Sequence, residues 1–352
     1  MPVTRLSPQN FSISSGGIKT FQFNWSDSEN ATYYKLLENI DGQSGFTVIR
    51  DNIPQGEQAI KVETSLHQAK SAQYMLQACI DDRCSGFSDI AFVQDNAKEL
   101  VKAVGFIKAS NTQKNDFFGG IFNADISSNS AMSLSADGLT LVVGAPGEDS
   151  ASITVNGVED NNGRNDSGAA YVFVKTADGW EQQAYLKARN AGADDHFGQA
   201  VSISADGNTL VIAAVDEDSN GQSVNPTDIE EQNNGASRSG AVYVFTRNDD
   251  QWSQQAFIKS SNSQIDDQFG MSVSINADGD RFIVGASNED SSATGISDVA
   301  ATDNAASNSG AVYVFDLVDN NWVEQAYIKA SNTQKDDLLG LNISISDDGN
   351  TI

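Results

Sequence analysis

Carboxylates are the residues of this chain best suited to chemistry, and they gather in three similar loops. Each loop follows an apolar run and contains a Glu-Asp pair, as at Glu148 and Asp149. Calcium takes six to eight oxygen ligands, and loops rich in Asp, Asn, Ser and Gly supply them. We therefore expect calcium at these loops; the alternative is an acidic rim that holds no ion. The candidate ligands are Glu148, Asp149, Asp166, Asp216, Asp218, Glu289 and Asp290.

Other catalytic machinery is sparse. The chain has two histidines, His67 and His196, so a Ser-His-Asp triad or a His-rich metal site has little to build on. Neither a P-loop nor a dinucleotide-binding glycine motif is present. Carboxylates that recur in every repeat indicate structure or a repeated ion site, because an active site is a unique constellation. We expect no enzymatic activity; the alternative is a glycosidase or lyase whose catalytic repeat lies beyond residue 352.

The charge balance excludes one class of partner. The chain carries 48 acidic and 21 basic residues, a net charge of −27. A nucleic-acid binder needs a basic surface to neutralise phosphates, so we expect no nucleic-acid partner.

We also expect no membrane insertion, because no apolar run approaches the roughly 20 residues of a transmembrane helix. The first residues form no signal peptide. An exported protein would therefore carry its signal outside this sequence.

These loops belong to a repeat. Residues 106–119 (FIKASNTQKNDFFG) return as similar stretches at 185–198, 257–270 and 327–340. Between successive copies lie an alternating run, an apolar run, the acid pair, a Ser-Gly-Ala-led strand and a Trp-led strand. Each unit therefore predicts four strands, with residues 167–173, 239–245 and 309–315 as third strands. Four-stranded units placed head to tail predict an all-β fold of β-propeller blades. Solenoid repeats, of about 20–45 residues, are shorter.

Spacing separates scaffold from binding surface. The distance from the Ser of the Ser-Gly-Ala motif to the next aromatic residue is constant, as between Ser167 and Tyr185. The loop between the second and third strands varies in length and carries most of the acids. In a propeller blade this loop and the connection to the next blade emerge on the same rim. Insertions on one face usually mark the binding face, so we expect the partner there. Residues 121–130 insert about ten residues into the first unit.

Two motifs in register carry a family resemblance. Phe197-Gly198 and Gly144-Ala145-Pro146, combined with SGAVYVF, resemble the FG-GAP repeat of integrin α-subunit propellers and their bacterial relatives. The resemblance covers about residues 99–352. It implies a propeller, often seven-bladed, with calcium in several blades and adhesion or ligand binding on the loop face. The chain departs from the family between its first and second strands, where short Ala-Asp-Gly turns lack the first two acids of the calcium ladder.

Residues 1–95 lie outside the repeat and predict seven short strands, near 5–13, 18–25, 32–38, 46–51, 58–63, 72–79 and 87–93. This pattern, with Trp25 on the second strand, predicts an immunoglobulin-like sandwich and resembles a fibronectin type III module. We therefore expect two domains, 1–95 and 96–352, with blades at about 118–188, 197–260 and 269–330 and a partial blade at 339–352. The chain stops inside a repeat, so we expect it to be part of a longer protein.

Cys79 and Cys84 are the only cysteines, and they flank the predicted hairpin between the last two strands of the first domain. Facing positions on paired strands lie within disulfide range, so we expect a disulfide. Two unpaired thiols are the alternative. An oxidised pair indicates an exported protein.

Three further residue types recur once per repeat. An Asp precedes each Phe-Gly position, and we expect its carboxylate to cap backbone N–H groups. A Lys follows each Trp-led strand, and we expect an ion pair between neighbouring blades with that Asp. A Trp opens the fourth strand, and we expect it to pack against its own hairpin. These residues are Asp116, Asp195, Asp267 and Asp337; Lys108, Lys187, Lys259 and Lys329; and Trp180, Trp252 and Trp322.

These features predict a non-enzymatic recognition or adhesion protein, located outside the cell, at its surface or in the periplasm. Its partner, a protein or a glycan, would bind the loop face. A structural spacer in a larger surface protein is the third interpretation.

Overall fold

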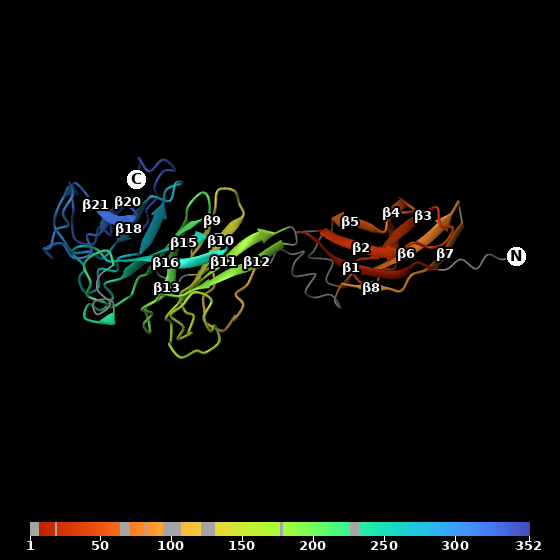
Figure 1. Cartoon of the computed structure of the whole chain (residues 1–352), viewed down its shortest axis with the longest axis horizontal. Coiled ribbons are helices and arrows are strands. Elements are labelled where there is room, and N and C mark those ends of the chain that lie inside the picture. Colours follow the sequence, from red (N-terminus) through yellow and green to blue (C-terminus); the bar gives the residue numbers. More distant parts are fainter. Residues whose placement is uncertain are drawn as a thin grey trace. The chain divides into compact units, whose positions relative to one another are not determined.

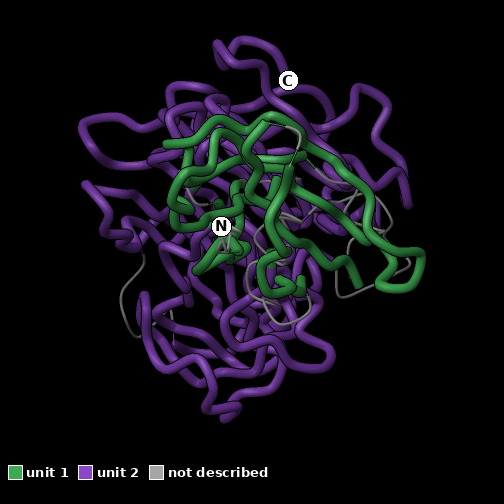
Figure 2. The backbone as a smooth tube through the Cα atoms, turned by 90° about the vertical axis from the view of Figure 1, so that its right-hand side faces the viewer, with its two compact units in different colours: residues 1–107, 175–180 green, residues 108–174, 181–352 purple. Residues whose placement is uncertain are grey.

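The computed structural model describes residues 7–17, 20–63, 71–81, 83–93, 107–120, 131–176, 179–225 and 232–352. Every named element in these residues is a β-strand, so the predicted all-β class is confirmed (Figure 1). The chain forms two compact units, residues 1–107 with 175–180 and residues 108–174 with 181–352 (Figure 2). None of the described residues lies in a helix that is long and apolar enough to cross a membrane.

The described residues up to 93 form eight strands in two antiparallel sheets. One sheet has the order β1-β2-β5, and the other has the order β4-β3-β6-β7, with β8 also paired to β6. The strands are β1 (Gln9–Gly17), β2 (Thr20–Ser26), β3 (Tyr33–Asn39), β4 (Thr47–Pro54), β5 (Ala59–Glu63), β6 (Gln73–Ile80), β7 (Arg83–Phe87) and β8 (Ala91–Phe92). The fibronectin-III-like sandwich is confirmed, except that the predicted last strand is divided between β7 and β8.

Alternating apolar residues build the core of this sandwich. Phe21, Phe23 and Trp25 occupy every second position of β2 and are buried, because successive side chains of a strand point to opposite faces. Trp25 lies 5.5 Å from Tyr34 between ring centroids. Cys79 on β6 pairs with its opposite residue Cys84 on β7 and forms a disulfide, as predicted.

The described residues from 131 onward form three successive sheets, each begun by its own first strand. Sheet one joins β9 (Met132–Leu134), β10 (Thr140–Ala145), β11 (Ala169–Thr176) and β12 (Gly179–Leu186). Sheet two joins β13 (Phe197–Ile203), β14 (Thr209–Ala214), β15 (Ala241–Asn248) and β16 (Gln251–Ile258). Sheet three joins β17 (Ser272–Ile275), β18 (Arg281–Ala286), β20 (Ala311–Val318) and β21 (Asn321–Lys329), with β19 (Gly295–Ser297) added beside β21. The four-stranded antiparallel units and their third strands are confirmed.

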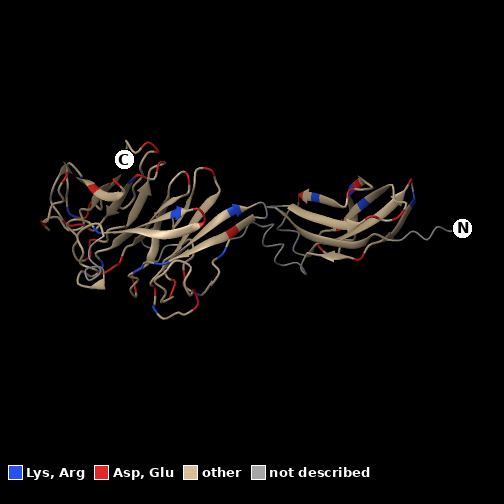
Figure 3. Ribbon diagram, in the orientation of Figure 1, with Lys and Arg blue, Asp and Glu red and all other residues tan. Residues whose placement is uncertain are grey.

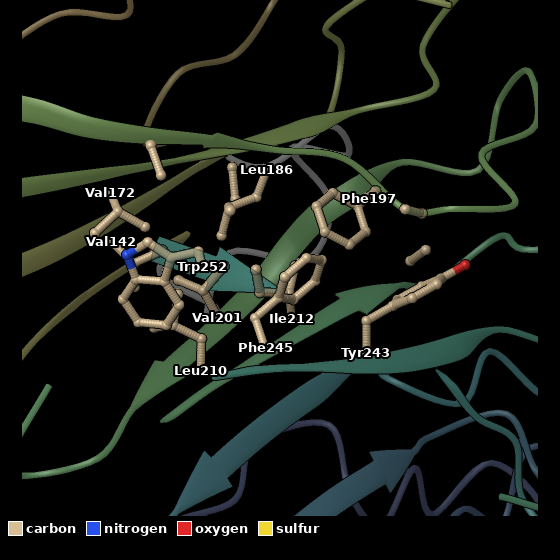
Figure 4. Close-up of a cluster of buried hydrophobic side chains, with 14 of the residues drawn as sticks. Val142, Val172, Leu186, Phe197, Val201, Leu210, Ile212, Tyr243, Phe245 and Trp252 are labelled. Carbon is tan, nitrogen blue, oxygen red and sulfur yellow. The ribbon is translucent and has the colours of Figure 1, made fainter. Parts of the chain in front are cut away.

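Apolar second and third strands hold the sheets together face to face. One buried cluster joins sheet one to sheet two (Figure 4). A second cluster, with Val211 and Val244 on one side and Phe269 and Phe282 on the other, joins sheet two to sheet three. Burial of such side chains contributes about 1.5–3 kcal/mol each. The first cluster includes Val142, Val172 and Leu186 of sheet one and Val201, Leu210, Phe245 and Trp252 of sheet two.

The tryptophans do more than pack against their own hairpins. Arg247, opposite Trp252 on the paired strand, lies over its ring. The indole Nε1 of Trp252, however, donates a hydrogen bond to Gln183 Oε1 of sheet one, at 2.9 Å. Trp322 repeats this contact, donating to Gln255 Oε1 of sheet two at 3.1 Å. The prediction was therefore incomplete, because these tryptophans also tie each sheet to the preceding one.

The Phe-Gly and Gly-Ala-Pro motifs meet where successive repeats join. A Cβ atom on Gly144 would lie 1.9 Å from the carbonyl oxygen of Gly198, in the next repeat. Gly285 and Gly340 repeat this relationship at 1.9 Å. Such a contact is too close for any side chain, so glycine is required at Gly144 and Gly285 for the two backbones to approach. We call this contact the repeat joint. Repeat two has Ala213 at the equivalent position, and a Cβ atom on Gly270 would lie 2.9 Å from the Cβ atom of Ala213.

Among the described strands no sheet closes into a ring. The stacked four-stranded sheets are therefore established, and their arrangement as propeller blades stays a prediction. Residues 95–104 at the predicted domain boundary, the insertion at 121–130 and His67 lie outside the described residues.

Candidate functional site at the repeat loops

The glutamate of each acid pair lies in a buried ion pair. Glu148 follows β10, and its Oε2 atom accepts a hydrogen bond from Lys187 Nζ at 2.9 Å. Lys187 Nζ also donates to Ser167 Oγ at 2.8 Å. Both charged side chains are almost fully excluded from solvent, with 0% and 2% exposed. The ends of the second and fourth strands thus meet at one rim of the sheet, and the ion pair fastens them together.

The same arrangement recurs in sheets two and three. Lys259 Nζ lies 2.8 Å from Glu217 Oε2 and 2.6 Å from Ser239 Oγ. In sheet three, Lys329 Nζ pairs with Glu289 Oε2 at 2.6 Å and with Ser309 Oγ at 2.7 Å. The predicted lysine partner was wrong for these three lysines, because each pairs with a glutamate in its own repeat rather than with the Asp before Phe-Gly.

An asparagine from the preceding connection completes each network. Asn190 Nδ2 donates to the second oxygen of Glu217 at 3.0 Å, and its Oδ1 atom accepts from the Tyr243 hydroxyl at 2.9 Å. Asn262 makes the corresponding bonds to Glu289 and Tyr313. Burial lowers the pKa of Lys259, while the charge of Glu217 opposes this shift. A buried ion pair is stable only when its remaining polar atoms are satisfied, and the asparagine satisfies one of them.

The aspartate of each pair serves the backbone. Asp149 Oδ1 accepts from the Asp166 N–H at 2.8 Å, and Asp218 Oδ1 accepts from the Arg238 N–H at 2.7 Å. Asp290 does the same for the Asn308 N–H at 2.8 Å. The residues that donate have positive φ, 48° to 53°. Non-glycine residues rarely adopt this conformation, so the carboxylates hold the loops in a strained turn.

The Asp before each Phe-Gly position caps its connection, as predicted. Asp267 Oδ2 accepts from the Gln264 N–H at 2.8 Å, and Asp337 Oδ2 accepts from the Gln334 N–H at 2.7 Å. Asp116 and Asp195 cap in the same way. Burial, with the nearby charge of Glu217, raises the pKa of Asp195 to about 7, although the Gly192 N–H opposes the shift. Burial likewise raises the pKa of Asp267 to about 7.

The predicted calcium ligands are thus distributed among different tasks. Glu148 and Glu289 pair with lysines, and Asp149, Asp218 and Asp290 hold backbone N–H groups, as described above. Asp166 is half-buried, and burial raises its pKa. Within the described part of the chain, no group of three or more His, Cys, Asp or Glu side chains is arranged to hold a metal ion. Three loop acids, Asp228, Glu230 and Glu231, lie outside the described residues. Calcium binding stays a prediction.

One group of loop residues does not repeat. Beside sheet two, Asp216 Oδ2 lies 2.8 Å from His196 Nδ1, while its Oδ1 atom accepts from Arg238 Nε at 3.2 Å and Gln268 Nε2 at 2.9 Å. Burial alone would raise the pKa of Asp216, but the His196 and Gln268 hydrogen bonds and the Arg238 charge lower it. These four residues line a cavity of about 650 Å³. We call it the His196 cavity.

Sequence reasoning missed this cavity because, of the residues that line it, only Asp216 and Asp218 entered the candidate site, and both as calcium ligands. The available signal was departure from the repeat. Where His196 stands, the other repeats have Phe117, Gln268 and Leu338, and where Arg238 stands, they have Asp166 and Asn308. Acidic residues are prominent in the loops of the second unit (Figure 3).

The comparisons with known proteins agree with the repeat. The family model described as the FG-GAP repeat matches residues 180–225 and 252–315. The predicted FG-GAP repeats are therefore confirmed over these residues, which run from β12 to the loop after β14 and from β16 to β20. No curated protein matches the chain.

Several solved structures are similar to this chain at low TM-scores. An Fn3-like protein from Clostridium thermocellum is 18% identical and matches 25% of this chain and 90% of its own, with a TM-score of 0.21. The rhamnogalacturonan lyase YesW is 10% identical over 93% of this chain and 53% of its own, with a TM-score of 0.29. A Ca²⁺-stabilized adhesin that helps an Antarctic bacterium bind ice is 11% identical over 93% and 92%, with a TM-score of 0.22. These similarities carry no functional argument.

Proposed function

We propose that this chain is a non-catalytic recognition protein, exported from the cell, whose FG-GAP repeats form blades of a β-propeller. The partner, a protein or a glycan, binds the face formed by the loops between second and third strands. The observation that carries this proposal is the contrast within each repeat between an invariant buried Lys-Glu-Ser network and a loop of variable length above it.

The repeated networks argue against catalysis by the acid pairs. A general acid or nucleophile must reach the substrate. Glu148, Glu217 and Glu289 are instead buried against lysines, with 1–2% of each residue exposed. Because the three networks have the same partners, they fit a scaffold role. The loops are left as the part of each repeat that can change without loss of the fold.

Propeller arrangement and export rest on separate observations. Each sheet packs against the next through equivalent strands, and a constant relationship between successive sheets is what a ring of blades requires. The Cys79–Cys84 disulfide supports export, since structural disulfides persist mainly in oxidising compartments. Calcium forms part of the proposal as a stabiliser of the loop acids.

A binding screen tests the proposal. Labelled protein is applied to immobilised extracellular proteins and purified polysaccharides, and the same polysaccharides are assayed for new reducing ends and unsaturated products. We expect saturable binding to at least one ligand without product. A double substitution in the loop of sheet three, Ile296→Ser with Val299→Ser, should weaken binding, because these side chains are 76% and 70% exposed.

The matched control is Val318→Ser in the β20–β21 turn, on the opposite rim of the same sheet, where 46% of the side chain is exposed. It should leave binding unchanged. Product release from any polysaccharide, the absence of saturable binding to the whole panel, or equal losses from the two rims would overturn the proposed function.

A further inference from the structure

The His196 cavity is the place where the second repeat departs most from its neighbours. Asp216 stands where the other repeats have Gly147 and Asn288, so this acid and its partners His196 and Arg238 are all particular to the second repeat. Residues that all repeats share are explained by the scaffold. Residues that one repeat alone has, gathered around one cavity, are explained by a ligand.

Asp216 fixes the walls of this cavity. It accepts hydrogen bonds from His196, Arg238 and Gln268, as described above, and the side-chain Oε1 atom of Gln268 accepts in turn from Asn288 Nδ2 at 2.7 Å. His196 is only 6% exposed. The donors and acceptors around the cavity are therefore held in place before any ligand arrives, which reduces the entropy lost on binding.

The charges around the cavity select against simple ions. Asp194, Asp216 and Asp218 line it together with one arginine, Arg238. An anion offers only acceptors and would meet three carboxylates. A small cation offers only donors and would meet the Arg238 guanidinium and the Gln268 amide beside those carboxylates. A hydroxyl group donates and accepts, so it can satisfy both kinds of neighbour at once.

Size and apolar surface point the same way. Small-molecule sites occupy roughly 300–1,000 Å³, and this cavity measures about 650 Å³. Ala193, Val215 and Met271 add apolar atoms to a lining whose other residues are polar. A pyranose ring presents hydroxyl groups at its rim and C–H groups on its face, which matches this combination.

We propose that the His196 cavity binds a neutral sugar unit, with Arg238 and Gln268 as donors and Asp194 and Asp218 as acceptors to adjacent hydroxyl groups. This inference rests on the proposed function and specifies its ligand class. The cavity is formed by residues from sheet two's loops and from the connection that leads into β17, so the sugar would bind where two repeats meet.

The test uses an array of immobilised neutral, acidic and amino sugars, followed by titration of the bound compound. Each variant introduces the residue that the third repeat has at the equivalent position. His196→Gln introduces the residue type of Gln268, and Arg238→Asn introduces that of Asn308. Gln268 and Asn308 both have a φ of 53°, close to the 57° of His196 and the 53° of Arg238, so the backbone tolerates these replacements. The matched control is Asn308→Asp, which copies Asp166 of the first repeat.

We expect the protein to bind neutral sugars in preference to acidic and amino sugars. Arg238→Asn should weaken this binding by about tenfold or more, as the loss of a charge-assisted hydrogen bond to the sugar predicts. His196→Gln should also weaken it, because Asp216 loses the partner that holds it in the wall of the cavity, while the control should not. Preference for charged sugars, an absence of sugar binding, or unchanged affinity in both variants would overturn the inference. Binding to a protein partner that survives both variants would leave the proposed function standing and refute the sugar site alone.

Discussion

Lys187 and Glu148 lie 39 positions apart in the chain, and their charged atoms lie 2.9 Å apart in the interior of the first repeat. The pair joins the end of the fourth strand, β12, to the loop that follows the second strand, β10. Because Lys259 with Glu217 and Lys329 with Glu289 repeat this relationship, the loops of all three repeats share one kind of foundation.

Removal of one partner from such a pair should destabilise the second unit strongly. We expect Lys259→Met to lower the free energy of unfolding by about 3–5 kcal/mol, because it leaves Glu217 as an uncompensated buried charge. The double variant Lys259→Met with Glu217→Gln should lose less than the sum of the single losses. Urea unfolding followed by circular dichroism measures both.

The matched control is Lys335→Met. Lys335 lies 3.9 Å from Asp336, and its side chain is 70% exposed. This exposed pair should contribute about 0–1 kcal/mol. If Lys259→Met lowers the free energy of unfolding no more than Lys335→Met does, the buried networks do not stabilise the loops.

Asp195 and Asp267 should make the second unit less stable as the pH rises. Burial raises the pKa of each carboxyl to about 7, above its ordinary value of 3.8. Between these values the folded state binds more protons than the unfolded state. The stabilisation is therefore complete below about pH 4 and is lost as the pH rises through about 7. One pKa unit corresponds to about 1.4 kcal/mol, so each residue contributes at most a few kcal/mol.

The double variant Asp195→Asn with Asp267→Asn should flatten this pH dependence, since the amide oxygen can still accept the backbone N–H. Melting temperatures measured between pH 4 and pH 8 would show the effect. Asp249→Asn, in the exposed β15–β16 turn, is the control and should keep the parental profile. A double variant with the parental pH dependence would contradict the assignment.

Calcium should raise the melting temperature of the second unit by several degrees at a fixed salt concentration of about 0.15 M, and a chelator should reverse the effect. Magnesium should act less, because it requires tighter octahedral geometry and releases water reluctantly. Replacement of Asp149, Asp218 and Asp290 together by Asn should remove most of the increment.

Asparagine is the informative replacement here because its side-chain oxygen can keep the loop N–H hydrogen bonds while the charge is lost. Equal effects of calcium and magnesium, with a triple variant that responds like its parent, would show that the loops form an acidic rim without a specific ion site.

The disulfide should stabilise the first unit modestly. Cys79 and Cys84 are separated by five positions, so the bond closes a short loop. The chain-entropy relation then gives about 2 kcal/mol, which the variant Cys79→Ser with Cys84→Ser should lose. Thiol titration of the denatured, unreduced protein should find no free thiol. Two reactive thiols would remove the argument for export.

Much of the fold could be predicted because the successive repeats contain the same strand patterns in the same order. Two such local patterns are the apolar run of β14 and the regular spacing in sequence between Phe197-Gly198 and the Ser-Gly-Ala motif that follows it. The lysine partners could not be predicted from proximity in sequence. Asp195 is eight positions from Lys187, and Glu148 is 39 away, but the order of strands in the sheet places the distant acid alongside.

The His196 cavity required a different kind of reasoning. Its residues are unremarkable one by one, and only their comparison with the equivalent positions of the other repeats distinguishes them. Residue type and spacing describe what repeats have in common, whereas the cavity depends on three substitutions, at His196, Asp216 and Arg238, that become neighbours only after the loops fold.

The repeat joint bears on how such a chain changes in length over evolution. Gly144 and Gly198 touch across the boundary between two repeats, so the family motif records a contact between neighbours rather than a property of one unit. A duplication or deletion of one whole repeat places the same two positions of neighbouring repeats in contact at each new junction. The number of repeats can therefore change by whole units without a new interface. An insertion or deletion of only part of a repeat would instead leave one of these positions without its counterpart.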